Sequence, residues 1–145
     1  MTAVAVTTAS VLAVAWMGKA WADQQLVGTD VSLGVLTLRL AYNPGVAFGL
    51  GAGAAPGLVL ALTMGISVIL AAAVLTHRLP FFGGSLVLGG ALANVIDRLP
   101  DGRVTDYLSV GWWPTFNLAD VAIVSGAALL VLPVRRRRAA RQTAT

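Results

Sequence analysis

Four long apolar stretches constrain this chain more than any other feature of its sequence. They cover about residues 3–22, 56–76, 81–97 and 118–134. At 1.5 Å per residue, a helix of roughly 20 residues crosses a hydrocarbon core of about 30 Å. Because 57% of the residues are hydrophobic and only 11% are charged, the composition excludes a water-soluble globule. We therefore predict an all-α membrane protein with four transmembrane helices in a single domain, residues 1–145.

The first stretch ends in Trp21 and Ala22, which imitate a signal-peptide cleavage site. No basic residue precedes the apolar run, so we expect a retained helix. In the third stretch, we expect four glycines to let neighbouring helices approach closely. These are Gly83, Gly84, Gly89 and Gly90.

Basic residues predict the orientation in a bacterial cytoplasmic membrane. His77 and Arg78 lie between the second and third stretches, and Arg135 to Arg138 follow the fourth. Because basic loops stay on the cytoplasmic side, both regions and both termini are expected there, with a disordered tail over 139–145. The high pI of 10.7 then reflects topology, and no nucleic-acid partner is expected. All six acidic residues fall on the opposite, outer side: Asp23, Asp30, Asp97, Asp101, Asp106 and Asp120.

Between the first two stretches, the segment Val35 to Tyr42 alternates between apolar and more polar positions. Leu36, Leu38, Leu40 and Tyr42 are expected on one face, and Thr37, Arg39 and Ala41 on the other. This pattern predicts a half-buried strand within a small extracytoplasmic β-cradle on the outer leaflet. Aromatic rings are expected at the same boundary, where they prefer the headgroup level. They are Trp16, Trp21, Trp112, Trp113, Tyr42 and Tyr107.

Polar residues gather where the third stretch ends. Asn94, Asp97 and Arg98 stand at i, i+3 and i+4, which places them on one helical face. For a generic membrane protein, a plain helix terminus with a surface contact between Asp97 and Arg98 is the preferred explanation of this cluster. The spacing alone therefore does not identify a functional site.

Two further aspartates each have a structural and a functional interpretation. Asp120 lies three residues after Asn117, as in a helix cap, but an acid at membrane depth is a functional candidate. Asp106 has the simpler explanation of a solvated loop charge near Arg103. If the two acids meet in a desolvated site, repulsion raises one pKa and one proton is shared. Such a pair can activate water and polarise a carbonyl, as in aspartic peptidases.

That chemistry needs no cofactor and no metal, and none is expected. The chain has no cysteine, and its one histidine, His77, lies on the predicted cytoplasmic turn, away from every acid. Neither a cysteine nucleophile nor a histidine metal cluster can therefore be assembled.

Four ordered runs resemble the lipoprotein signal peptidase family, the type II signal peptidases of bacteria. They are NPGVAFG at 43–49, GGALANVIDR at 89–98, GRVTDY at 102–107 and FNLAD at 116–120. The resemblance implies a multi-pass membrane aspartic endopeptidase, active at the outer face and surrounded by membrane lipids. Its substrates would be prolipoproteins, cut just before a diacylglyceryl-modified cysteine.

The resemblance also implies roles for particular residues. Asp106 and Asp120 match the catalytic pair. The matching polar residues expected to line the site are Asn43, Asn94, Asp97, Arg98 and Asn117. The enzyme is expected to act as a monomer, and the glycines of segment 49–55 indicate mobility near the site.

One position departs from the family pattern. The family usually carries an aspartate four residues before the lysine of the first helix, but Ala15 precedes Lys19 here. Asp23 is placed to meet Lys19 from the other side. An alternative hypothesis is therefore a family paralogue that binds lipopeptides without cleaving them. A proton-coupled exporter is disfavoured, because no ionisable residue lies in the middle of a stretch.

Overall fold

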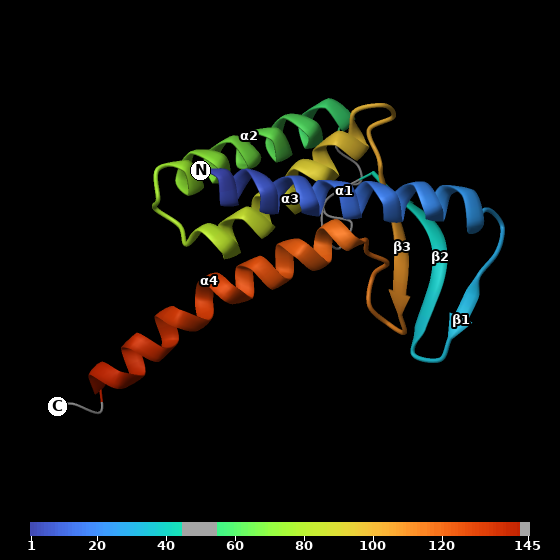
Figure 1. Cartoon of the computed structure of the whole chain (residues 1–145). Helices are drawn as coiled ribbons and strands as arrows, with labels where there is room; N and C mark the ends of the chain where they lie inside the picture. Colours follow the sequence, from blue (N-terminus) through green and yellow to red (C-terminus); the bar gives the residue numbers. More distant parts are fainter. Residues whose placement is uncertain (45–54, 143–145) are drawn as a thin grey trace.

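The computed structural model describes residues 1–44 and 55–142 and is mostly helical, with one small sheet (Figure 1). Four helices and three strands occupy these residues. In chain order they are α1 (Thr2–Gln25), β1 (Val31–Leu33), β2 (Leu36–Asn43), α2 (Pro56–Leu75), α3 (Phe81–Arg98), β3 (Val104–Val110) and α4 (Leu118–Gln142). The helix positions agree with the four apolar stretches of the sequence.

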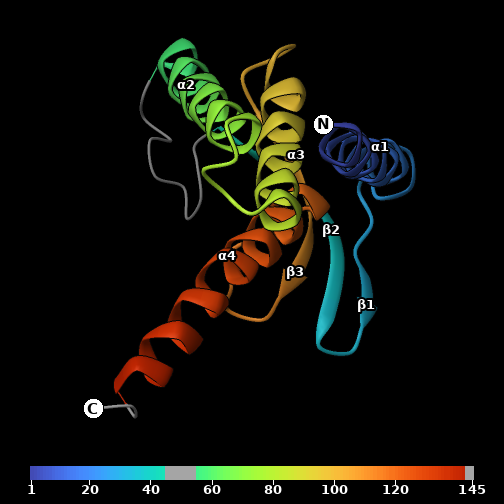
Figure 2. The same ribbon diagram turned by 60° about the vertical axis from the view of Figure 1, so that its left-hand side comes forward.

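Helix α3 is the central helix, in contact with α1, α2 and α4 (Figure 2). Glycines make this packing close, as expected. A Cβ atom on Gly89 would lie 2.8 Å from Cβ of Val11 in α1, and one on Gly90 would collide with the carbonyl oxygen of Ala119 in α4. The backbones of three helices therefore meet at distances that larger residues would prevent.

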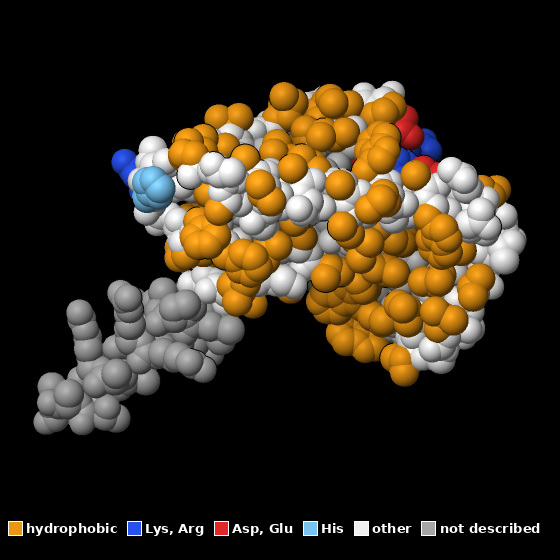
Figure 3. Space-filling view, viewed as in Figure 1, with side chains coloured by type: hydrophobic (Ala, Val, Ile, Leu, Met, Phe, Trp, Pro, Cys, Tyr) orange, Lys and Arg blue, Asp and Glu red, His pale blue; other side chains and the backbone are white. Residues whose placement is uncertain are grey.

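Two of the described helices are long and apolar enough to cross a membrane, Thr2–Gln25 and Gly57–Leu75. Leu118–Val131 in α4 forms a shorter apolar helix. Helix α3 need not be apolar on every side, because other helices surround it. Hydrophobic side chains cover much of the visible face; acidic and basic ones gather near the sheet end of the bundle, and further basic ones lie beside the histidine at the opposite end (Figure 3).

The sheet is antiparallel in the order β1-β2-β3. Strand β2 agrees with the predicted strand within one residue at each end, but the expected alternation fails at its last residues. A register shift between Leu38 and Ala41 brings Ala41 opposite Asp106. Because opposed residues share a face, this irregularity places Asn43 on the side of Asp106 and leaves Tyr42 exposed.

Five of the six aromatic rings expected at the membrane boundary are at least two-fifths exposed, and Tyr107 is the exception. Its side chain is only 3% exposed and packs with Ala22 and Leu26. Gly18 makes this possible, because a Cβ there would collide with the hydroxyl of Tyr107. Tyr107 is therefore buried within the protein, and its ring joins β3 to the end of α1.

The C-terminal segment also differs from expectation. Helix α4 continues to Gln142, so residues 139–142 of the expected disordered tail are helical. Arginine, alanine and glutamine are all good helix formers, which explains the continuation. Residues 143–145, and the segment 49–54 that was expected to be mobile, lie outside the described residues.

Candidate active site

Polar side chains from α3, β2, β3 and the start of α4 meet at one end of the bundle. We call five of them the carboxylate site: Asn43, Asn94, Asp106, Asn117 and Asp120. All five are linked by hydrogen bonds. The fold therefore brings together residues that lie up to 77 positions apart in the sequence.

Asp106 lies in β3 and is only 3% exposed. Asn117 Nδ2 donates to its Oδ1 at 2.9 Å, and Asn43 Nδ2 donates to its Oδ2 at 3.3 Å. Burial, followed by the negative charge of Asp120, raises the pKa of Asp106 to about 7, although the two amide donors oppose the shift. Asp106 therefore holds its proton far more readily than an ordinary aspartate.

Asp120 lies in the first turn of α4. Its Oδ1 accepts a hydrogen bond from Asn94 Nδ2 at 2.9 Å, and its Oδ2 accepts one from the backbone N–H of Asn117 at 3.1 Å. The N–H of Asp120 donates in return to Asn117 Oδ1 at 3.1 Å. This reciprocal pair is a capping box, so the capping interpretation is correct and coexists with the acid's place in the carboxylate site.

Asn117 connects the two acids. Its Nδ2 donates to Asp106 and also to Asn94 Oδ1 at 3.1 Å, while Asn94 in turn donates to Asp120. The side-chain amides thus form a continuous path from one carboxylate to the other. Amides orient carboxylates without neutralising them, so burial and the charge of Asp120 still raise the pKa of Asp106.

Asp97 and Arg98, expected to line the site, make different contacts. Asp97 Oδ2 accepts the backbone N–H of Thr105 at 2.7 Å, so this acid holds the residue before Asp106. Arg98 is 3% exposed, and its Nη1 lies 3.5 Å from the carbonyl oxygen of Asn94. Its guanidinium is within electrostatic reach of both Asp106 and Asp120.

A second polar cluster adjoins the carboxylate site, and we call it the lysine clamp: Lys19, Asp23, Asp97 and Thr105. Lys19 Nζ lies 2.7 Å from Asp23, 2.7 Å from Thr105 Oγ1 and 3.1 Å from Asp97. Sequence analysis discussed Lys19 but assigned it no place in the site. A lysine within a membrane helix was the available signal, since such a charge needs a partner.

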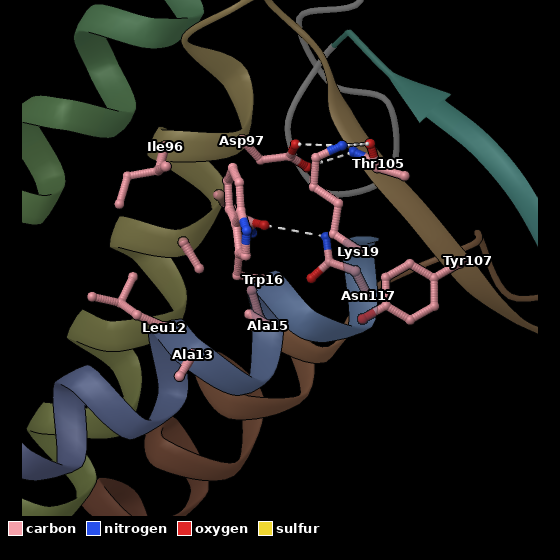
Figure 4. A pocket seen from close by; sticks show the side chains of 13 residues that line it. Leu12, Ala13, Ala15, Trp16, Lys19, Ile96, Asp97, Thr105, Tyr107 and Asn117 are labelled. Atoms are coloured by element: carbon pink, nitrogen blue, oxygen red, sulfur yellow. Dashed lines mark hydrogen bonds and ion pairs between the residues drawn. The ribbon is translucent and has the colours of Figure 1, made fainter. Parts of the chain in front are cut away.

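Two hollows flank the carboxylate site. One, of about 310 Å³, is lined by Ala15, Trp16 and Lys19 of α1 together with Asn94 and Asn117. Figure 4 shows Lys19 and Asn117 close together in this hollow. The other, of about 400 Å³, has Asp120 in its wall. The remaining residues of the second hollow are mostly apolar: Val110, Trp113, Phe116, Val121, Val124 and Ser125. One carboxylate therefore lies beside an apolar surface.

The family model described as signal peptidase II matches residues 7–135. A lipoprotein signal peptidase of Rhodococcus jostii is 43% identical over 106 residues, which are 68% of this chain and 53% of that protein. The one from Solibacter usitatus is 38% identical over 131 residues, 77% and 80% of the two chains. The chain thus spans about half of the first relative and four fifths of the second.

Two solved bacterial membrane enzymes have the same fold. The structure determined by the in meso method at 2.3 Å resolution has a TM-score of 0.78 and 21% identity, over 94% of this chain and 89% of the other. The structure at 1.9 Å has a TM-score of 0.75 and 20% identity, over 92% and 93% of the two chains. The similarity includes the sheet as well as the helices, since it covers nearly the whole chain.

Proposed function

The chain belongs to the signal peptidase II family, and we propose that it is an aspartic endopeptidase whose catalytic pair is Asp106 and Asp120. Membership implies a membrane protease that removes signal peptides from prolipoproteins. The observation that supports the catalytic pair is the path from one buried carboxylate to the other through the amides of Asn117 and Asn94.

In the proposed mechanism, the raised pKa makes Asp106 the member that carries the proton. Asp106 donates a hydrogen bond to the carbonyl oxygen of the scissile bond, and ionised Asp120 takes a proton from water. The water oxygen attacks the carbonyl carbon directly, without an acyl-enzyme. Asp120 then passes its proton to the leaving nitrogen as the C–N bond breaks. Asn43 and Asn117 keep both acids in place throughout.

The substrate in this proposal is a diacylglyceryl-modified prolipoprotein. The apolar hollow beside Asp120 is suited to acyl chains, because Val121 and Val124 continue it along α4. The scissile peptide would then meet the carboxylates at the end of that hollow. An apolar surface next to a water-activating acid is the combination that a lipidated peptide requires.

We further propose that four helices cross the membrane with both termini in the cytoplasm and the site at the outer face. The polar contacts of the bundle support this orientation, because they concentrate where α3 meets the sheet. His77 and Arg78 lie at the opposite end of α3, between Leu75 and Phe81. A monomer suffices, since every residue of the proposed site comes from one chain.

Cleavage of a purified lipid-modified prolipoprotein in detergent tests this assignment. Asp106→Asn and Asp120→Asn should each lower the rate at least about 10³-fold, since each removes one half of the acid–base pair. The matched control is Asp101→Asn, an exposed aspartate that accepts the N–H of Arg103 at 3.0 Å. Full activity of either first variant, with normal folding, would end the assignment. Substrate binding by the wild type without product would instead support the non-cleaving alternative.

A further inference from the structure

We infer that Asp23 is a positioning residue for this reaction: it fixes Lys19, and through Lys19 the strand that carries Asp106. The inference rests on the proposed function, because positioning matters only if Asp106 reacts. It assigns a role to an acid that lies outside the carboxylate site, in the last turn of α1.

The contacts of Lys19 account for all of its donors. An ammonium group has three N–H bonds, and Lys19 has three acceptors within 3.1 Å, in Asp23, Asp97 and Thr105. Lysine side chains are flexible, so one fewer acceptor leaves the group free to rotate away from the other two. Asp23 therefore completes the set that holds the ammonium against Thr105.

Thr105 connects the lysine clamp to the proposed chemistry. Its hydroxyl accepts from Lys19 at 2.7 Å, and its backbone N–H donates to Asp97 at 2.7 Å. The next residue along β3 is Asp106, which must keep its 2.9 Å contact with Asn117. A small displacement of Thr105 therefore moves a carboxylate whose position determines the reaction geometry.

Helix stability does not explain an acid at position 23. The last turn of a helix carries the negative end of its dipole, so Asp23 is unfavourable there without a cation. The contact with Lys19 supplies that cation at 2.7 Å, and the two side chains are 24% and 35% exposed. The ion pair is thus partly shielded from water, which strengthens it relative to a fully solvated pair.

Ala15 offers an independent way to test this role. It lies one turn before Lys19, is 9% exposed, and lines the 310 Å³ hollow that Lys19 also lines (Figure 4). A carboxylate at position 15 would have room to meet Lys19 from the opposite side, at i–4 instead of i+4. Asp23 and an acid at position 15 should therefore be interchangeable anchors for the same ammonium.

The decisive experiment compares cleavage rates of Asp23→Asn, Asp23→Glu and the double variant Ala15→Asp/Asp23→Asn. Asp23→Asn should lower kcat about tenfold with KM unchanged, because Asp106 is misplaced while substrate contacts remain. Asp23→Glu and the double variant should recover most of the loss. The matched control is Asp30→Asn, which breaks an exposed pair with Arg39. Wild-type kcat in Asp23→Asn, or a loss that neither compensating variant reduces, overturns the inference.

A second measurement separates this inference from the proposed function. Hydrogen exchange of the Thr105 amide, followed by NMR in detergent, should be about tenfold faster in Asp23→Asn and normal in the double variant. This readout needs no substrate. If the wild type fails to cleave, the proposed function falls, while the exchange rates still decide whether Asp23 fixes β3. Unchanged exchange in Asp23→Asn overturns the inference.

Discussion

The carboxylate site and the lysine clamp are neighbours that treat their aspartates differently. In the clamp, the ammonium of Lys19 contacts both Asp23 and Asp97. In the carboxylate site, the hydrogen bonds to Asp106 come from amides, and its pKa rises to about 7. A cation in direct contact neutralises an acid and fixes structure, whereas amide donors fix an acid without adding a positive charge of their own. The difference separates a structural anchor from a group suited to proton transfer.

The largest expected effect concerns the contribution of Asp106 to the unfolding free energy of the protein, which should depend on pH. The folded pKa of about 7 lies above the ordinary value of 3.8, so the folded state binds more protons between these pH values. The contribution is complete below about pH 4 and is lost as the pH rises through 7. Wild-type unfolding free energy should therefore fall over this range by up to about 4 kcal/mol, at about 1.4 kcal/mol per pKa unit.

Asp106→Asn should largely remove this dependence, because the neutral amide does not titrate. Denaturant unfolding in detergent at pH 5 and pH 8 would measure both proteins. At pH 8, Asp106→Asn should gain stability over the wild type, because it lacks the buried charge. Part of this gain will be offset, since the new amide nitrogen faces the donors of Asn43 or Asn117. A wild type that becomes more stable from pH 5 to pH 8, relative to Asp106→Asn, would contradict the comparison.

A smaller effect is expected from Gly90→Ala, which disturbs one cluster without touching the other. The new Cβ would collide with the carbonyl oxygen of Ala119, next to Asp120. Overpacking of this kind costs about 1–3 kcal/mol, and cleavage should fall as α4 moves away from Asn94. Thermal unfolding and the cleavage rate would both be recorded. Gly65→Ala is the control, because apart from its chain neighbours and its own helix backbone nothing lies within 4 Å of the new Cβ.

Substitutions of Asn117 can separate its role as a helix cap from its contact with Asp106. Asn117→Ala should destabilise the protein by about 1 kcal/mol through loss of the cap on Asp120. Asn117→Ser keeps a capping oxygen but, like Asn117→Ala, loses the donor to Asp106, so it should be about 1 kcal/mol more stable than Asn117→Ala while cleavage falls in both. Equal activity of Asn117→Ser and the wild type would mean that the amide donor is not needed.

The smallest effect should come from Asp30→Asn. Asp30 and Arg39 pair at 2.7 Å, but their side chains are 56% and 48% exposed. Solvated pairs of this type contribute less than about 1 kcal/mol, so unfolding free energy should barely change. A loss of clearly more than about 1 kcal/mol would mean that exposure does not weaken this pair as expected.

Helix positions could be predicted closely from the sequence, because a long apolar stretch indicates a membrane helix without reference to the rest of the chain. The predicted strand 35–42 was likewise close to β2, whereas β1 and β3 were not assigned. Strand β3 carries Asp106, and this segment is a strand because it pairs with β2. Such pairing is a tertiary property that local alternation does not report.

The assembly of the candidate site was predicted only in part. Short motifs identified Asn94, Asp106, Asn117 and Asp120, which the fold brings into one network. Of the three partners of Lys19, Asp23 was expected from its i+4 spacing, and the contact is confirmed. Asp97 and Thr105 could not be predicted as partners, because they lie far along the chain, Thr105 by 86 residues.

The register shift in β2 adds one residue to this strand opposite Tyr107, between the pairs that Leu38 and Ala41 make with β3. Counting from Leu38 to Ala41 spans three steps on β2, but only two on β3, from Leu108 to Asp106. Deleting one residue there would restore regular pairing with Ala41 still opposite Asp106 and Asn43 still opposite Val104, so the Asn43 amide would stay on the same face of the sheet. Relatives that lack the extra residue can therefore keep the same donor for Asp106, and what the extra residue adds is one more side chain at this point of the strand.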